Sequence, residues 1–215
     1  CWNGFVARPQ FMEIYNTSDV RGAGKSEGTM AKNQYAWFLG ALCTEKGDTI
    51  ADNDGTPIVI VPEVESLDAA NRVDGARMYK YEIDKTGTYT YMENDFVLLR
   101  YADVILMKKE ALLRGGQDDA PGIENPSVDA IKKRSFSYEA DPIAAFDKAY
   151  PDAFTTLGTG LKDGILAERG RELTWENQRR RDLIRFGQFE KIQYVKNTAE
   201  TRRWFPIPYT VLQKA

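Results

Sequence analysis

Residues 94–116 read NDFVLLRYADVILMKKEALLRGG. Their apolar side chains recur at helical spacing, Asn94 or Asp95 can cap the start of a helix, and the two final glycines can end it. The stretch therefore predicts one long helix. Apolar residues over 128–136 predict a second, shorter helix packed antiparallel to the first. Together they would form a helical hairpin like one tetratricopeptide unit.

Helical patterns continue toward the carboxyl terminus, so the fold class is predicted to be mainly α. A short helix is expected about residues 143–146. Residues 161–186 predict a long helix with one buried face and one face that carries ion pairs. Residues 204–208 read WFPIP, and each proline disfavours helix at the residue before it. This last segment is expected to be extended and to pack back on the body.

The amino-terminal part, residues 1–93, is irregular and rich in loops. Asn53-Asp54-Gly55 is a strong turn signal, and the β-branched residues that follow between two prolines suit an edge strand. A β-hairpin centred on Asp54 is therefore expected. The other short elements expected here are a helix over 9–16, a loop over 18–30, and strands over 78–83 and 89–91.

Composition excludes several classes of protein. The 29 basic and 32 acidic residues of this 215-residue chain give a net charge of -3, so no basic field attracts nucleic acid. No apolar run approaches the roughly 20 residues that span a bilayer. The chain has no histidine, which excludes Ser-His-Asp, Cys-His and histidine-metal mechanisms. Cys1 and Cys43 make no disulfide framework, and the bulky residues after Cys1 do not resemble the polar tether of a lipidated cysteine.

Several motifs occur in a fixed order along nearly the whole chain. They are Trp-Asn-Gly-Phe at 2–5 with Asp19 and Arg21, Arg-Tyr-Ala-Asp at 100–103, Glu-Arg-Gly-Arg-Glu-Leu at 168–173 and Pro-Ile-Pro at 206–208. In combination they resemble the SusD/RagB family of glycan-binding lipoproteins, which serve outer-membrane nutrient uptake. The chain begins midway through the family pattern, so a fragment or one of two chains is expected. Lys108 and Lys109 depart from the pattern, because small or aromatic residues are common there.

The resemblance implies a SusD-like helical fold in a single carboxy-terminal region, residues 1–215. Residues 1–93 would face the ligand and residues 94–215 would form the helical scaffold. The implied function is non-catalytic binding of glycans or oligosaccharides at the bacterial outer-membrane surface, without a cofactor, for delivery to a SusC-like TonB-dependent transporter. A lipid anchor would belong to the missing amino-terminal part. Related proteins also carry peptides or other nutrients, so the ligand class stays open.

Three glutamates, Glu168, Glu172 and Glu176, fall at a spacing of four and would line one helix face among several arginines. A pair of carboxylates is the machinery of a glycosidase, but one of them must be held protonated. Neighbouring positive charge favours the ionised form, so a structural ion-pair network is expected instead. Arg100 and Asp103, three residues apart, are likewise expected to bridge elements rather than to recognise a ligand.

Two loop motifs resemble ligand-binding loops but lack residues that binding would require. Asp52-Asn53-Asp54-Gly55 is similar to part of a calcium loop, but the first and twelfth ligand positions would fall on Ile50 and Val61, which favours a plain turn. Residues 22–26, GAGKS, resemble the end of a phosphate-binding loop without its first glycine or its preceding strand, which favours an ordinary loop.

Aromatic residues beside amides are the candidate glycan contacts. The C–H faces of sugars stack on aromatic rings, and sugar hydroxyl groups pair with planar amides and guanidinium groups. The candidates are Trp2, Asn3, Asn33, Tyr35 and Trp37. The alternative for each aromatic is packing in the core, because large aromatic residues are mostly buried. Trp175 and Trp204 are assigned to packing.

Two other functions remain open. A carboxylate-based glycoside hydrolase would need two carboxyl groups facing one cleft, roughly 5 to 9.5 Å apart. A helical-repeat adaptor for protein partners would show an exposed apolar groove without clustered aromatic and amide groups.

Overall fold

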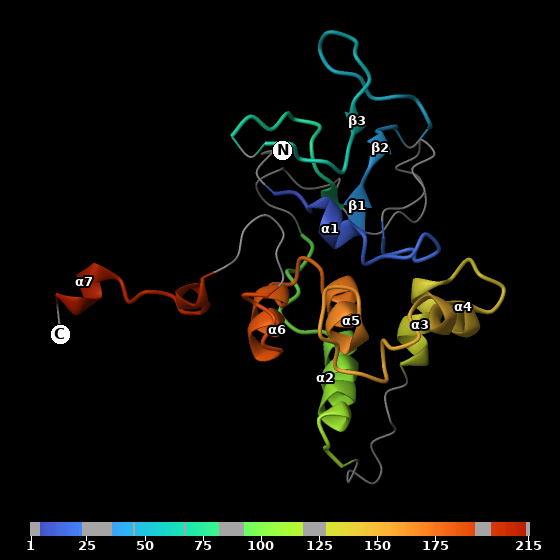
Figure 1. The fold of residues 1–215 in the computed structure, drawn as a ribbon. Helices are drawn as coiled ribbons and strands as arrows, with labels where there is room; N and C mark the ends of the chain where they lie inside the picture. Colours follow the sequence, from blue (N-terminus) through green and yellow to red (C-terminus); the bar gives the residue numbers. More distant parts are fainter. Residues whose placement is uncertain are drawn as a thin grey trace.

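The computed structural model describes residues 5–22, 36–44, 46–66, 68–81, 93–117, 128–191 and 199–213 (Figure 1). Helices outweigh strands in these residues, which confirms the mainly α fold class. The longer helices lie together in the lower part of Figure 1, and the short strands lie above them with α1. No described helix combines the length and the hydropathy that crossing a bilayer requires.

Two small antiparallel sheets form the upper part. β1 (Ala36–Phe38) pairs with β4 (Arg77–Tyr79), and β2 (Gly40–Ala41) pairs with β3 (Val59–Ile60). In the turn between β2 and β3, Asp52 Oδ1 accepts the backbone N–H groups of Asp54 and Thr56 at 2.9 Å. Antiparallel pairing of Ala51 with Pro57 closes the loop. The predicted hairpin centred on Asp54 is confirmed, and so is the turn that was favoured there.

The upper part has its own small core. α1 (Pro9–Met12) is shorter than the helix predicted over 9–16, because the chain continues in turns after Met12. The Phe11 ring lies edge-on against Trp37, with 6.1 Å between ring centroids, and Tyr15 lies edge-on against the same indole at 6.5 Å. Burial of these rings with Ala7 and Ala76 holds α1 on the strands. The strand predicted over 89–91 lies outside the described residues.

α2 (Tyr101–Leu113) begins later than predicted. Its amino-terminal cap is Arg100, in an extended conformation, instead of Asn94 or Asp95. Arg100 uses its guanidinium to reach Glu172 and Glu176, far along the chain, so tertiary ion pairing decides where this helix starts. The apolar residues before it, such as Leu98, are exposed, although their spacing matches the helix.

α2 ends as predicted, at the glycine pair. The N–H of Gly116 donates to the Ala111 carbonyl at 2.9 Å and the N–H of Gly115 to the Leu112 carbonyl at 3.0 Å, while Gly115 has a φ of 89°. This is a Schellman ending, in which a left-handed residue turns two backbone donors onto the last helical carbonyls.

Gly115→Ala is expected to lower the free energy of unfolding by about 1 kcal/mol. A Cβ at this position would meet no atom within 4 Å, so the penalty comes from the left-handed backbone alone. Urea unfolding measures it. Gly115→Asn is the matched control and should lose less, because asparagine tolerates this conformation. Equal stability of the alanine variant and the wild type would contradict this account of the helix end.

The helical hairpin exists, but its members differ from those predicted. α3 (Asp129–Ser135) packs on α4 (Pro142–Ala149), whereas α2 packs mainly against α5 (Gly164–Glu172). The prediction that α3 pairs with α2 is therefore wrong. The Phe136 and Phe146 rings meet edge-on at 5.6 Å, in a core that also holds Ile105 and Leu106 of α2. Buried aromatic rings thus decide that α3 pairs with its sequence neighbour α4. The helix expected about residues 143–146 is confirmed.

The long helix predicted over residues 161–186 is broken in two. α5 ends at Glu172 and α6 (Arg179–Arg185) follows a turn in which Trp175 and Asn177 have left-handed φ values of 65° and 59°. Lys80 Nζ donates to the Glu172 carbonyl at 2.7 Å and to the Thr174 carbonyl at 3.0 Å. These bonds satisfy carbonyl groups that a continued helix would have used, and a cation suits a helix carboxyl terminus.

The carboxy-terminal segment does not pack back on the body. A short turn of 3₁₀ helix, Glu200–Arg203, and α7 (Tyr209–Leu212) extend away from the other helices (Figure 1). Trp204 is 76% exposed and Phe205 is 81% exposed, so the expectations of packing for this segment and for Trp204 are wrong. The side chain of Arg180 holds the base of the segment by donating to the backbone carbonyls of Arg202 and Arg203.

Candidate functional site

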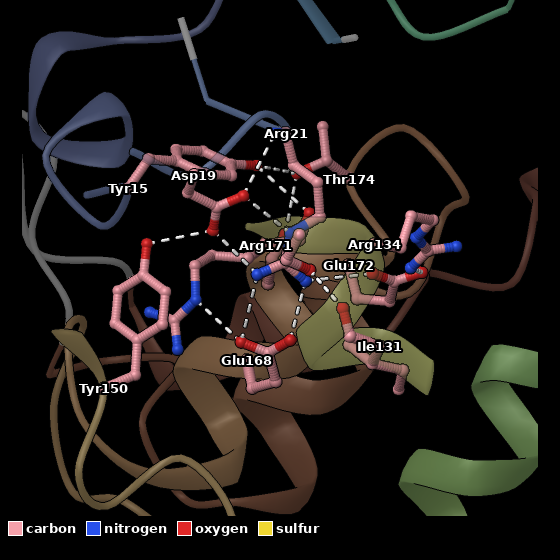
Figure 2. Close-up of polar contacts among 12 residues, drawn as sticks. Tyr15, Asp19, Arg21, Ile131, Arg134, Tyr150, Glu168, Arg171, Glu172 and Thr174 are labelled. Carbon is pink, nitrogen blue, oxygen red and sulfur yellow. Dashed lines mark hydrogen bonds and ion pairs between the residues drawn. The ribbon is translucent and has the colours of Figure 1, made fainter. Parts of the chain in front are cut away.

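An ion-pair network joins α5 to the loop after α1. Arg21 donates from Nε and Nη2 to the Asp19 carboxylate at 2.9 and 2.7 Å, and from Nη1 to Glu168 at 2.6 Å and to Glu172 at 2.9 Å (Figure 2). Arg171 Nε donates to the second oxygen of Glu168 at 2.8 Å. All five side chains are buried, so each charge has its partner where water is excluded.

Two tyrosines complete this network. Tyr150 donates to Asp19 Oδ2 at 2.9 Å and its ring lies 3.6 Å from the Arg171 guanidinium carbon (Figure 2). Tyr15 shares a hydrogen bond with Thr174 at 2.9 Å. Burial raises the pKa of Tyr15 to about 12 and raises that of Tyr150 further, so both hydroxyls stay neutral.

The carboxyl end of α5 is surrounded by cations. Arg100 Nε donates to Glu176 at 2.7 Å and its Nη1 to Glu172 at 2.6 Å, while Arg134 also pairs with Glu172. Burial alone would raise the pKa of Glu172, but the charges of Arg21, Arg134 and Arg100 lower it to about 2. Glu172 is therefore ionised at neutral pH, which agrees with the expected structural role of this carboxylate.

A second network ties α5 to α2 and α6. Arg169 is 1% exposed, and its Nε donates to Asp182 at 2.8 Å while its Nη1 lies 3.0 Å from Asp103. Arg185 pairs with Asp182 and with Glu110. Arg100 and Asp103 thus bridge elements, as expected from the sequence, although each does so through α5 and its following turn.

A pocket of about 370 Å³ opens beside the first network. It is lined by Val20, Arg21, Lys80, Arg100, Arg134, Ser137, Arg171, Glu172 and Thr174. Its cations are engaged: Arg21, Arg100 and Arg134 pair with Glu172, and Lys80 pairs with Glu176. Burial lowers the pKa of Lys80 to about 8, against the opposing effect of Glu176. The charged side chains that line this pocket are therefore already paired with other protein groups.

A second pocket, of about 540 Å³, lies where the turn between α5 and α6 meets α1 and β1. We call it the Trp175 pocket. From the amino-terminal part it is lined by Val6, Ala7, Arg8, Phe11 and Trp37. From the turn and the start of α6 it is lined by Leu173, Thr174, Trp175, Asn177, Gln178, Arg179 and Arg180.

The turn after α5 makes this pocket. Left-handed backbone is uncommon for a residue such as Trp175, although asparagine at 177 tolerates it, and such conformations cluster at functional sites. Trp175 is half-buried, and its indole lies edge-on against Phe5 with 6.2 Å between centroids. The Arg179 guanidinium lies 5.8 Å from the Phe11 ring centroid. Rings, amides and guanidinium groups therefore meet in one hollow, which is the set of groups that recognises a sugar.

Four of the five predicted site residues, Trp2, Asn3, Asn33 and Tyr35, lie outside the described residues, and their role stays a prediction. Trp37 is 2% exposed and packs against Phe11 and Tyr15, while contributing to the wall of the Trp175 pocket. Such burial fits the core-packing alternative for Trp37. Its contact with a glycan also stays a prediction.

Sequence reasoning missed the residues of the turn. Residues 174–179 read TWENQR, so an indole stands beside two amides and an arginine, the same pattern that selected the other candidates. The pattern was passed over because residues 161–186 were predicted to be continuously helical. A continuous helix would place Asn177, two residues after Trp175, on another face, whereas the turn lines one pocket with Trp175, Asn177, Gln178 and Arg179.

Comparison with models of protein families gives a match over nearly the whole chain. The family model described as the SusD family matches residues 2–204. No curated protein matches the chain, and no solved structure matches it. Proteins of the matched family are generally non-catalytic binding proteins.

Proposed function

This chain belongs to the SusD family, and on that premise we propose that it binds glycans in the Trp175 pocket without cleaving them. The observation that carries the proposal is the meeting of Trp175, Asn177, Gln178 and Arg179 in one hollow. The ring offers an apolar face for sugar C–H groups, and the amides and guanidinium group offer partners for hydroxyls. Family membership supports the ligand class, because SusD proteins are associated with glycan binding for nutrient uptake.

The carboxylates favour binding over hydrolysis. None of the described residues that line the Trp175 pocket is an aspartate or a glutamate. In the neighbouring pocket, the lowered pKa of Glu172 leaves it ionised at neutral pH, and a glycosidase needs one carboxyl group that is protonated. Neither of these two pockets therefore has a pair of carboxyl groups in its described lining, and the binding function is the better supported of the two.

The pocket also favours a glycan over a protein partner. A helical-repeat adaptor would present an apolar groove without clustered aromatic and amide groups, and this pocket contains both. In the proposed role the protein acts at the outer-membrane surface and passes its ligand to a SusC-like transporter. The support is that SusD-family proteins are typically found there and generally work with such transporters.

Trp175→Ala is expected to weaken glycan binding about tenfold to a hundredfold, the effect of removing a central aromatic contact. Isothermal titration calorimetry against a panel of oligosaccharides, with the products analysed afterwards, provides the measurement. Trp175→Phe should keep part of the affinity because it retains a ring.

Trp204→Ala is the matched control, since this tryptophan is exposed and outside the pocket. It should bind like the wild type. Unchanged affinity in Trp175→Ala would show that the glycan does not bind in the Trp175 pocket. Shortened sugars in the product analysis would show that the protein is a glycoside hydrolase and not a binding protein. If no oligosaccharide binds, the glycan proposal itself is wrong.

A further inference from the structure

Three arginines of the Trp175 pocket have no carboxylate partner among the described residues. Arg8, Arg179 and Arg180 line the pocket, and none of them forms an ion pair there. Arg179 Nη1 donates to the Leu166 carbonyl at 2.8 Å, but its Nε and Nη2 are buried without a hydrogen-bond partner. Arg8 Nε is buried without a partner as well.

Arg8, Arg179 and Arg180 are half-buried, and they differ in their charge partners from the three fully buried arginines. Arg21, Arg169 and Arg171 are each buried, and each is matched by one or more carboxylates within 3.0 Å. Burying a cation without a counter-charge is unfavourable, and so is leaving its N–H groups unpaired. A pocket that gathers three arginines and no acidic residue is therefore a site prepared for an anion.

We propose that the ligand of the Trp175 pocket is an acidic glycan, one that carries carboxylate or sulfate groups on its sugars. The inference rests on the proposed glycan-binding function and narrows it to a substrate class. A planar guanidinium group donates two parallel hydrogen bonds to a carboxylate or sulfate. The Nε and Nη2 of Arg179 are unpaired but shielded, so a turn of this side chain toward the pocket would bring both donors to the acidic group. Trp175 then holds the sugar ring while Arg179 and Arg8 hold its acidic group.

Arg180 contributes in a different manner. Its guanidinium carbon lies 5.2 Å from the Phe189 ring centroid and 4.6 Å from that of Phe205, and Nη2 donates to the backbone carbonyls of Arg202 and Arg203. No described carboxylate neutralises this charge. Arg180 therefore adds positive potential at the pocket while its position is fixed by the carboxy-terminal segment, and it attracts an anion without needing to touch it.

The experiment compares matched oligosaccharides that differ only in charge. Calorimetry would use oligogalacturonide and its methyl ester, and a sulfated galactan oligosaccharide and its desulfated form. We expect at least one acidic member to bind about tenfold or more tightly than its neutral partner, the effect of a charge-assisted hydrogen bond. The first pair reports a carboxylate and the second a sulfate. Binding of the acidic member should weaken as salt rises from about 0.05 M to about 0.5 M.

Variants distinguish glycan binding itself from the preference for an acidic glycan. Arg179→Gln and Arg8→Gln should bring the acidic ligand close to the affinity of its neutral form, whereas Trp175→Ala should weaken both forms. Lys133→Gln removes one positive charge from an exposed position on α3, outside the pocket, and should bind like the wild type. Equal binding of acidic and neutral members, without salt dependence, would overturn the acidic preference and leave glycan binding standing. Absence of binding by every oligosaccharide would overturn both.

Discussion

Arg169→Met is expected to lower the free energy of unfolding by about 3 to 5 kcal/mol, the usual loss when one partner of a buried ion pair is removed. Arg169 is 1% exposed, and it compensates Asp182 at 2.8 Å and Asp103 at 3.0 Å. Methionine fills much of the volume but leaves both buried carboxylates without this cation. Because α2, α5 and α6 meet at this arginine, its loss should affect the whole helical part. Urea unfolding followed by tryptophan fluorescence measures the effect.

The control for Arg169 is an ion pair at the surface. Lys162 Nζ lies 2.8 Å from Glu13, and their side chains are 59% and 56% exposed, so Lys162→Met should lose no more than about 1 kcal/mol. Asp103→Leu added to Arg169→Met should recover part of the loss, because it removes one of the two uncompensated charges. If Arg169→Met were as mild as Lys162→Met, these buried pairs would contribute little to stability.

Much of the helical scaffold could be predicted from apolar spacing and capping residues. The ending of α2 at Gly115, the helix about residues 143–146 and the hairpin around Asp54 all depend on neighbours within a few residues. Such local signals are readable from a sequence. The start of α2 and the break after α5 were not readable, because Arg100 and Lys80 reach across the fold to form them.

The sequence predicted that an ion-pair network exists around these glutamates, but it did not predict which residues pair with them. The spacing of Glu168 and Glu172 indicated one charged face, and the structure places both on α5 as expected. Their buried partner Arg21 lies in a loop 147 residues before Glu168, and no periodicity connects the two. In the sequence, Asp19 and Arg21 stand out only as part of the family resemblance. Ion pairs between residues far apart in the sequence are the part of this fold that local sequence patterns do not predict.

The turn between α5 and α6 contributes residues both to the ion-pair network and to the Trp175 pocket. Glu176 pairs with Arg100 and Lys80, which fixes the far side of the turn, while Trp175 and Asn177 on either side of it line the pocket. The left-handed backbone at these two positions is therefore held in place by ion pairs. Substitutions at Glu176 should consequently disturb ligand binding even though Glu176 does not line the pocket.

Acid is expected to destabilise the protein between about pH 4.5 and about pH 2 through Glu172. The charges of Arg21, Arg134 and Arg100 outweigh burial and lower the pKa of this carboxyl group from 4.5 to about 2. A group whose pKa is lower in the folded state stabilises the fold fully above its unfolded pKa, and that contribution is lost as the pH falls through the folded value. For Glu172 the loss amounts to about 3 kcal/mol. Urea unfolding at a series of pH values measures it.

Glu172→Gln tests whether this residue is responsible. The variant should be less stable than the wild type at pH about 6, because Arg21 and Arg100 lose a buried counter-charge. Its stability should fall less toward pH about 2, since the glutamine cannot be protonated in this range, so the two curves should converge in acid. Glu139→Gln removes an exposed carboxylate from the same protein and serves as the control. Parallel curves for Glu172→Gln and the wild type would assign the acid sensitivity to other carboxylates, whereas convergence would assign it to the ionised Glu172 and its arginine partners.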